Sequence, residues 1–225
     1  MSTRTRLVFS ADIDAEKFRI YDGLDRMGGA ATATFQFRPS GAFAAPTLSV
    51  FARVGADLYR SDLRDGYRVV VGTWIHQPLT DRVDGVAGFQ VDQRHATSPV
   101  FEGRDWSGRI HLDYSVFDRH RLYLTGEYRR GDAVSIGAPA SAMLALSKSW
   151  TRDDVFTDTN RYAYRFDAAT VGATLGYNWP FADRQAFDIS WRWIRTRPDR
   201  TVAYPGWASV EYVVNQITVT YLWRF

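Results

Sequence analysis

The chain ends in the stretch ITVTYLWRF, which spans Ile217 to Phe225 and alternates apolar with polar residues up to its last position. Successive side chains of an extended strand point to opposite faces, so Thr218, Thr220 and Arg224 share one face of this segment. The last residues of a soluble domain usually fray. A terminal segment that keeps its pattern to the end is therefore predicted to be a strand of a sheet. The opposite face carries the apolar and aromatic members, Ile217, Val219, Tyr221, Trp223 and Phe225.

The same two-residue period recurs throughout the sequence. In TLSVFARVGADLY, every second residue from Leu48 to Leu58 is apolar, while the intervening positions include Arg53 and Asp57. No long segment shows the 3.6-residue period of a helix, and neither a repeat nor a composition shift marks a domain boundary. We therefore predict an all-β protein with a single domain, residues 1–225. Its predicted strands are 2–11, 29–38, 47–60, 67–77, 83–95, 105–117, 121–130, 161–178, 186–197 and 208–225.

Composition excludes several classes of function. Apolar residues make up 45% of the chain, but no run approaches the ~18 apolar residues of a membrane helix. The 28 basic and 25 acidic residues are interleaved, which argues against a nucleic-acid partner. The absence of cysteine removes thiol catalysis, disulfides and thiolate metal sites. Four scattered histidines and the lack of a nucleotide-binding motif predict no metal and no cofactor.

Strand length and loop pattern favour a barrel that crosses a membrane. Most of the segments run ten residues or more, close to the ~9–11 of a membrane-spanning strand and above the ~5–6 typical of globular proteins. Short connections alternate with longer loops, as expected when the two ends of a barrel face different compartments. The longest connection, 131–160, is predicted to be an extracellular loop. The prediction is a transmembrane antiparallel up-and-down β-barrel of about ten strands.

Aromatic residues gather near the two ends of the predicted apolar faces, where amphipathic rings would meet the membrane interfaces. Those near the short connections are Phe37, Phe117, Tyr177, Trp179, Trp223 and Phe225. Those near the long loops are Tyr67, Trp106, Tyr128, Trp191 and Trp193. We predict that they form two aromatic girdles.

The terminal stretch resembles the C-terminal signal of bacterial outer-membrane β-barrel proteins, which ends in Phe after alternating hydrophobic residues. The resemblance covers about nine residues, and it implies an outer-membrane location with lipid and lipopolysaccharide around the barrel. It also implies that the barrel-assembly machinery recognises Tyr221, Trp223 and Phe225. The N-terminus leads straight into a strand-like segment, so an exported protein would have lost a signal peptide. The alternative expectation is that the chain is the C-terminal piece of a longer protein.

The polar faces of the strands would point into the barrel, where charges must be paired or hydrated. These residues are Arg38, Arg53, Asp57, Arg68, Asp84, Asp92, Arg109, His111, Asp113, Glu127, Arg129, Asp188 and Arg192. The short turns suggest which residues of neighbouring strands lie opposite each other. A shift of this register by two residues would leave every side chain on the same face of the sheet. The pairs placed opposite each other are His76–Asp84, Arg68–Asp92, Ser115–Tyr123 and His111–Glu127.

A barrel of ten strands is close to the size at which side chains fill the interior. We therefore expect a non-enzymatic protein: a small porin-like or structural barrel with surface-loop binding, or the membrane anchor of a larger protein. The alternative is an outer-membrane hydrolase, an omptin-like protease or a lipid-modifying enzyme, with its site at the extracellular rim. His111 with Asp113 or Glu127 would be its base–acid pair, or the rim residues Asp92, His95 and Asp105. A soluble lipocalin-like carrier is a third interpretation.

The predicted loop 131–160 is the other candidate site. Its segment APASAMLALSKSW is mildly amphipathic and is predicted to form a short helix over or in the mouth of the barrel. Such a segment acts as a lid or as a patch for partners, unless it is only a mobile surface loop.

Overall fold

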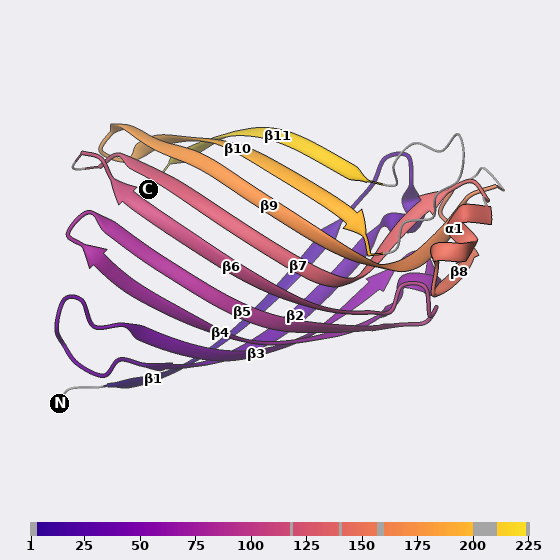
Figure 1. Ribbon diagram of the computed structural model, residues 1–225, viewed down its shortest axis with the longest axis horizontal. Coiled ribbons are helices and arrows are strands. Elements are labelled where there is room, and N and C mark those ends of the chain that lie inside the picture. The colour runs from indigo at the N-terminus through magenta and orange to yellow at the C-terminus, as the bar shows by residue number, and fades with distance from the viewer. Residues whose placement is uncertain (1–3, 118, 140, 157–159, 200–210, 224–225) are drawn as a thin grey trace.

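The computed structural model describes residues 4–117, 119–139, 141–156, 160–199 and 211–223. Ten strands follow one another in chain order in a single antiparallel sheet, and an eleventh short strand pairs only with β9 (Figure 1). The ten are β1 (Thr5–Glu16), β2 (Arg26–Phe37), β3 (Thr47–Tyr59), β4 (Gly66–Thr80), β5 (Val83–Ala96), β6 (Gly103–Ser115), β7 (Arg121–Gly137), β9 (Tyr162–Ala182), β10 (Gln185–Pro198) and β11 (Tyr212–Trp223).

Several predicted strand boundaries are wrong, and the ends of β1 and β7 differ most; β2 also begins at Arg26 instead of residue 29, and β9 ends at Ala182 instead of residue 178. β1 continues to Glu16, past its predicted end at residue 11, because the alternation persists through Asp12, Ile13 and Asp14. β7 continues to Gly137, past the predicted loop start at 131. Beyond Gly131, β7 leaves β6 and stays paired with β9 alone. The long connection is therefore 138–161, and its described part contains α1 (Ser141–Leu146) and β8 (Ser149–Arg152).

The sheet has two different ends. The connections between β4 and β5 and between β9 and β10 are two residues long. At the opposite end lie the 3-10 turns η1 (Asp22–Leu24) and η2 (Asp62–Arg64), together with α1 and β8. The sheet curls as it runs from β1 to β11, and both β1 and β11 have their terminal ends on the short-turn side (Figure 1). An even number of strands in the main order produces this arrangement.

The apolar face of the sheet is the more exposed one. Along β3, Leu48, Val50, Val54 and Leu58 are 43–62% exposed, while the alternate residues of the other face, Ser49, Phe51, Arg53, Gly55 and Asp57, are buried or half-buried. Soluble sheets bury the apolar face. The total accessible surface is 14928 Å², against about 10,400 Å² expected for a compact protein of this mass. The sheet is thus an inside-out, curved wall, with apolar side chains on its outer surface.

The polar face is the concave one, because its side chains reach across intervening strands. Arg53 on β3 donates hydrogen bonds of 2.7 and 2.8 Å to Asp12 on β1, past β2. Tyr123 on β7 donates a hydrogen bond of 2.8 Å to Asp188 on β10, past β9. Side chains of strands two apart come this close only where they converge. The predicted inward direction of the polar residues of these strands fits this geometry.

Aromatic rings fill part of the concave face by lying over glycines. The ring of Trp74 covers Gly88, where a Cβ atom would lie 1.8 Å from the ring, and Tyr123 covers Gly176 in the same way, at 2.1 Å. In both cases ring and glycine are directly opposite on neighbouring strands. Glycine is required here because no other residue leaves room for the ring. These rings narrow the space enclosed by the sheet.

The two predicted hairpin registers are wrong by two residues. Asp84 lies opposite Pro78 rather than His76, and Arg68 lies opposite Arg94 rather than Asp92. Likewise, His111 lies opposite Thr125 and not Glu127. A shift of two leaves every side chain on its predicted face, so the alternation could not distinguish the registers.

The sheet retains two edges. Among the described residues, β1 pairs only with β2 and β11 only with β10. No helix in the described part of the chain is long and apolar enough to cross a membrane.

Candidate functional site

Most of the predicted inward residues form a polar network of separate hydrogen-bonded or ionic pairs on the concave face, and the expected partners Arg68–Asp92 and His76–Asp84 are among them although their registers differ. Three of the contacts join two of the predicted inward residues, while in the others the partner is not one of them. The first group consists of Arg68–Asp92 at 2.7 Å, His111–Asp113 at 2.9 Å and Arg192–Glu127 at 3.9 Å. The second consists of Arg53–Asp12 at 2.7 Å, Asp57–Arg26 at 2.5 Å, Arg129–Asp105 at 2.7 Å, Asp188–Tyr123 at 2.8 Å and Asp84–His76 at 3.4 Å.

Two predicted members lie outside these pairs. Arg38 follows the end of β2 and donates to the backbone oxygen of Ala42 at 3.0 Å, so it closes a turn instead of joining the network. Arg109 lies directly opposite Glu127 on β7. Arg26 is the main residue that sequence reasoning missed; it contacts Asp14, Glu16 and Asp57. The predicted connection 12–28 includes Arg26, although the alternation of polar Arg26 with apolar Met27 is the signal that would have placed it on β2.

A strap, residues 153–156, ties the long connection to the loops of the first strands. Asp153 accepts a hydrogen bond of 2.6 Å from Arg64 of η2, and its side chain is fully buried. Asp154 accepts one of 2.6 Å from Ser61. At the far end of the strap, Phe156 packs edge-on against Tyr21, with ring centroids 5.0 Å apart. One segment thereby contacts the β1–β2 and β3–β4 loops together.

The buried apolar clusters of the described chain lie at the same end. In one, Val100 and Phe101 of the β5–β6 loop pack with Ala163 of β9, and Leu63 of η2 borders it. The Arg64 guanidinium lies 4.2 Å from the centroid of the Phe101 ring, so the ion pair of the strap also covers this cluster. In the other, α1 packs onto β9, as predicted for a helix at the mouth. Its buried members are Met143, Tyr164, Phe166 and Ala168.

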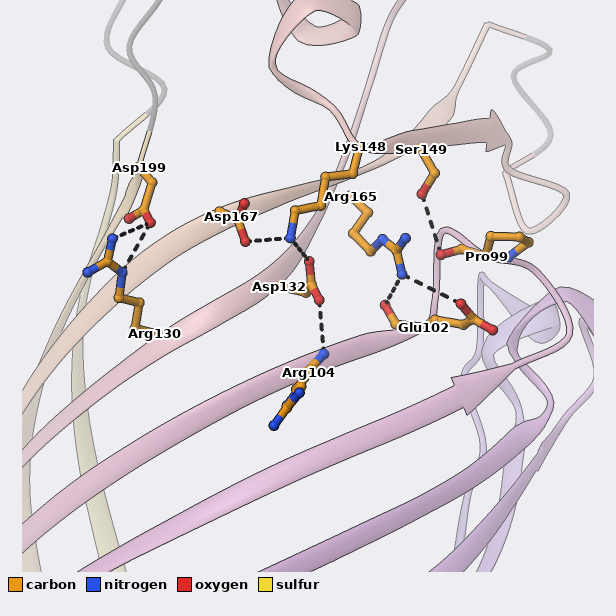
Figure 2. A network of polar contacts seen from close by, with 10 residues as sticks. All are labelled: Pro99, Glu102, Arg104, Arg130, Asp132, Lys148, Ser149, Arg165, Asp167 and Asp199. Atoms are coloured by element: carbon orange, nitrogen blue, oxygen red, sulfur yellow. Dashed lines mark hydrogen bonds and ion pairs between the residues drawn. The ribbon is translucent and has the colours of Figure 1, made fainter.

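The base of the long connection is held by charges (Figure 2). Asp132 and Asp167 lie directly opposite each other on β7 and β9, an unfavourable like-charge pair. Lys148 lies between them and donates to Asp132 at 2.8 Å and to Asp167 at 2.5 Å. Burial lowers the pKa of Lys148, but the two hydrogen bonds outweigh it, so that its pKa lies above the ordinary value. Arg165 similarly contacts Glu102, across to the β5–β6 loop.

Inside this capped end is a cavity of about 620 Å³, which we call the vestibule. Its wall is drawn from six strands and the β5–β6 loop, and it carries both charged and apolar side chains. Charged residues that line it include Asp92, Arg94, Asp105 and Arg129, and apolar ones include Phe101, Ile136, Phe166 and Tyr212.

The residues considered for hydrolysis do not assemble at the rim. Asp92 and Asp105 face each other on β5 and β6, but each accepts from its own arginine. The ring of His95 instead stacks on Tyr67, at 4.7 Å between centroids. His111 does contact Asp113, and its other ring nitrogen lies 2.7 Å from the Thr125 hydroxyl. In the described part of the chain, no group of three His, Asp or Glu side chains is arranged to hold a metal ion.

The predicted girdle and signal residues lie on the apolar face or at its ends. Phe37, Trp106, Trp179 and Trp191 are exposed, as is Phe117 in the turn after β6. Tyr177 and Trp193 are partly buried, and the Tyr177 hydroxyl contacts His120 at 2.7 Å. Tyr221 and Trp223 are exposed near the end of β11. Phe225 lies outside the described residues.

Comparison with known proteins gives little further guidance. No protein-family model matches the chain, and no curated protein matches it. Among solved structures, the chain is similar to the siderophore receptor PiuA from Acinetobacter baumannii, with 12% sequence identity and a TM-score of 0.38. The match covers 98% of this chain and 42% of the receptor, so the chain spans less than half the length of that protein. A likeness at this level carries no argument about fold or function.

Proposed function

We propose that the chain is an outer-membrane β-barrel whose curved sheet closes on itself around the polar network. The observation that carries this proposal is the exposure of the apolar face. Leu48, Ile110 and Val219 are 43%, 59% and 64% exposed on three different strands, whereas Arg53 finds its carboxylate partner on the concave side. In water such a surface would be costly, at about 25 cal/mol for each Å² of apolar area. In hydrocarbon the cost disappears.

Closure follows from the same environment, because lipid offers no partner to the backbone groups of a free edge. The registers also say where the edges should meet. Following directly opposite residues from Leu7 across all the ladders leads to Val213 on β11. Ten strands tilted by about 35–45° need a stagger of roughly 10–14 residues on closure. A stagger toward the C-terminal end of β1 keeps β1 beside β11, whereas a stagger in the other direction would move the two strands past each other. A stagger in the middle of this range puts Ile13 opposite Val219.

Cysteine cross-linking tests this closure, since the natural chain has no cysteine. Ile13→Cys is combined in turn with Ile217→Cys, Val219→Cys and Tyr221→Cys, which sample the range of staggers. We expect a disulfide within one chain, strongest for Val219, in protein inserted into lipid vesicles. Leu7→Cys with Val213→Cys, the unstaggered pair, is the negative control. Absence of any intrachain disulfide from the three test pairs would contradict closure, and a disulfide between two chains would indicate strand pairing between copies.

Within this barrel we propose a non-enzymatic role, as a structural or narrow porin-like barrel that presents its capped loops for binding. The support is the occupied interior: rings over Gly88 and Gly176, and ion pairs across strands such as Arg53–Asp12. The capped loops would also be available for binding if the chain is the membrane anchor of a larger protein. The hydrolase has less support: His111 does contact Asp113, but the acids at the rim, Asp92 and Asp105, are occupied by arginines.

Planar-bilayer recording measures how open the interior is. We expect current steps far smaller than those of a wide, water-filled channel, because a ten-stranded barrel lies near the size that side chains fill. Removing the ring over Gly88 with Trp74→Ala should increase the step size. A large ohmic channel in the unmodified protein would rule out the narrow barrel.

A further inference from the structure

We propose that the vestibule binds a small organic anion, a carboxylate with an apolar body, through the guanidinium of Arg94. The inference depends on the proposed barrel, which makes the concave face a lumen. It assigns a class of ligand to the capped end and names Arg94 as the residue that binds it.

Arg94 lies opposite a like charge and lacks a carboxylate partner of its own. Arg68 and Arg94 lie directly opposite each other on β4 and β5, and like charges in that position repel. The nearest carboxylate in this ladder, Asp92, is 4% exposed and accepts from Arg68. Arg94 itself has no ion-pair partner among the described residues.

The next carboxylate along the wall is also occupied. Asp105 lies opposite Asp92 and accepts a hydrogen bond of 2.7 Å from Arg129. Glu102, at the top of the vestibule, contacts Arg165 at 3.7 Å. Arg68 and Arg129 thus each pair with an aspartate, whereas the exposed side chain of Arg94 keeps its guanidinium without an ion-pair partner in the described part of the chain. Asp132, another carboxylate of the lining, is bound by Lys148.

The rest of the vestibule wall supplies apolar surface. Phe101 and Phe166 are held in buried clusters and present apolar surface to the cavity, and Tyr212 lines the same cavity from β11. Phe101 is further fixed by the Arg64 guanidinium above it. A cavity of about 620 Å³ lies within the usual range of about 300–1000 Å³ for one small ligand. A carboxylate can pair with a guanidinium through two parallel hydrogen bonds, which leaves the apolar body against these rings.

Isothermal titration of the full chain, folded in lipid nanodiscs, tests the site with a matched pair of probes. Benzoate carries the carboxylate, and benzyl alcohol has the same ring without a charge. We expect benzoate to bind the unmodified protein more tightly than benzyl alcohol, and Arg94→Gln to weaken benzoate at least about tenfold, the scale of a charged hydrogen bond. Arg94→Lys, which keeps the charge but not the fork, should retain part of the affinity.

The control is Arg109→Gln, which removes a second arginine of the concave face that does not line the vestibule. It should leave benzoate binding unchanged. Equal binding of the two probes, or equal losses in Arg94→Gln and Arg109→Gln, would overturn the anion site. The Ile13–Val219 disulfide is measured on the same proteins. A closed chain that fails to distinguish the probes refutes the site alone, whereas a chain that fails to close refutes the barrel.

Discussion

The two ends of the sheet are built from the same strands but are stabilised differently. At the long-loop end, segments far apart in sequence bury Val100, Ala163 and Tyr164 and enclose an ion pair. At the short-turn end, turns such as Asp183–Arg184 join adjacent strands directly. Both side chains of the ion pair between Arg119 and Asp183 are exposed there. A two-residue turn needs only the ladder beside it. Long connections must find contacts with one another, and here they form a small dry core.

The comparison also separates two uses of apolar residues. On the outer face of the strands, apolar side chains are exposed and match the proposed hydrocarbon around them. At the capped end they pack together as they do inside soluble proteins. A substitution should therefore have very different effects depending on which of these surroundings it meets.

The largest contrast is expected between the ion pairs of the two ends. Arg64→Ala leaves the carboxylate of Asp153 buried without its cation, which should cost about 3–5 kcal/mol of local stability. Hydrogen exchange at the Asp153 amide, which donates to the Arg161 oxygen, measures this opening. Arg119→Ala, the matched removal at the short-turn end, should not change stability measurably. Similar effects of both variants would mean that the capped end is not a separate dry core.

A charge on the outer face should have the next largest effect. Ile110 is 59% exposed in the middle of β6, and Ile110→Lys should lower the free energy of unfolding by about 2–4 kcal/mol in lipid vesicles. Ile110→Val, which keeps the surface apolar, should be nearly neutral. Urea-induced unfolding followed by tryptophan fluorescence gives both values. If lysine is tolerated as well as valine, the face does not meet hydrocarbon.

A smaller effect is expected on the concave face, between the two ends. Gly88→Ala places a Cβ where the Trp74 ring lies and should cost about 1–3 kcal/mol, because the ring must move into the lumen. Gly126→Ala on β7 is the control, since no atom lies within 4 Å of its added Cβ. The same unfolding assay compares the two variants. Equal stability would show that the ring does not need the glycine.

The smallest effect concerns the titration of the short-turn end. A hydrogen bond and the charge of Arg119 hold the pKa of Asp183 below its usual 3.8. The stabilisation from this pair is present above about pH 4 and is lost as the pH falls through the folded pKa. Arg119→Ala should return the pKa toward 3.8, which carboxylate chemical shifts measured by NMR would detect. An unchanged pKa would mean that the exposed pair is not formed in solution.

Local periodicity in the sequence determined much of the architecture. Alternation fixes which face of a strand each side chain occupies, so Arg53, Asp188 and Leu48 lie on the expected faces without any knowledge of neighbouring strands. The ten strands, their order and the short helix of the long connection followed from the same local signals. The alternation was missed at several strand ends, among them Asp12 and Asp14 of β1, Arg26 of β2 and the last residues of β7.

Only the tertiary structure decided the partners. A two-residue slip preserves every face, so alternation could not distinguish Thr125 from Glu127 as the residue opposite His111. The Arg64–Asp153 ion pair joins residues 89 positions apart and has no local signal. The lack of an ion-pair partner for Arg94 among the described residues likewise depends on which arginine lies opposite and which carboxylate is already occupied. Such contacts are set by how the strands slide against one another and how the loops cross, and both depend on the whole sheet.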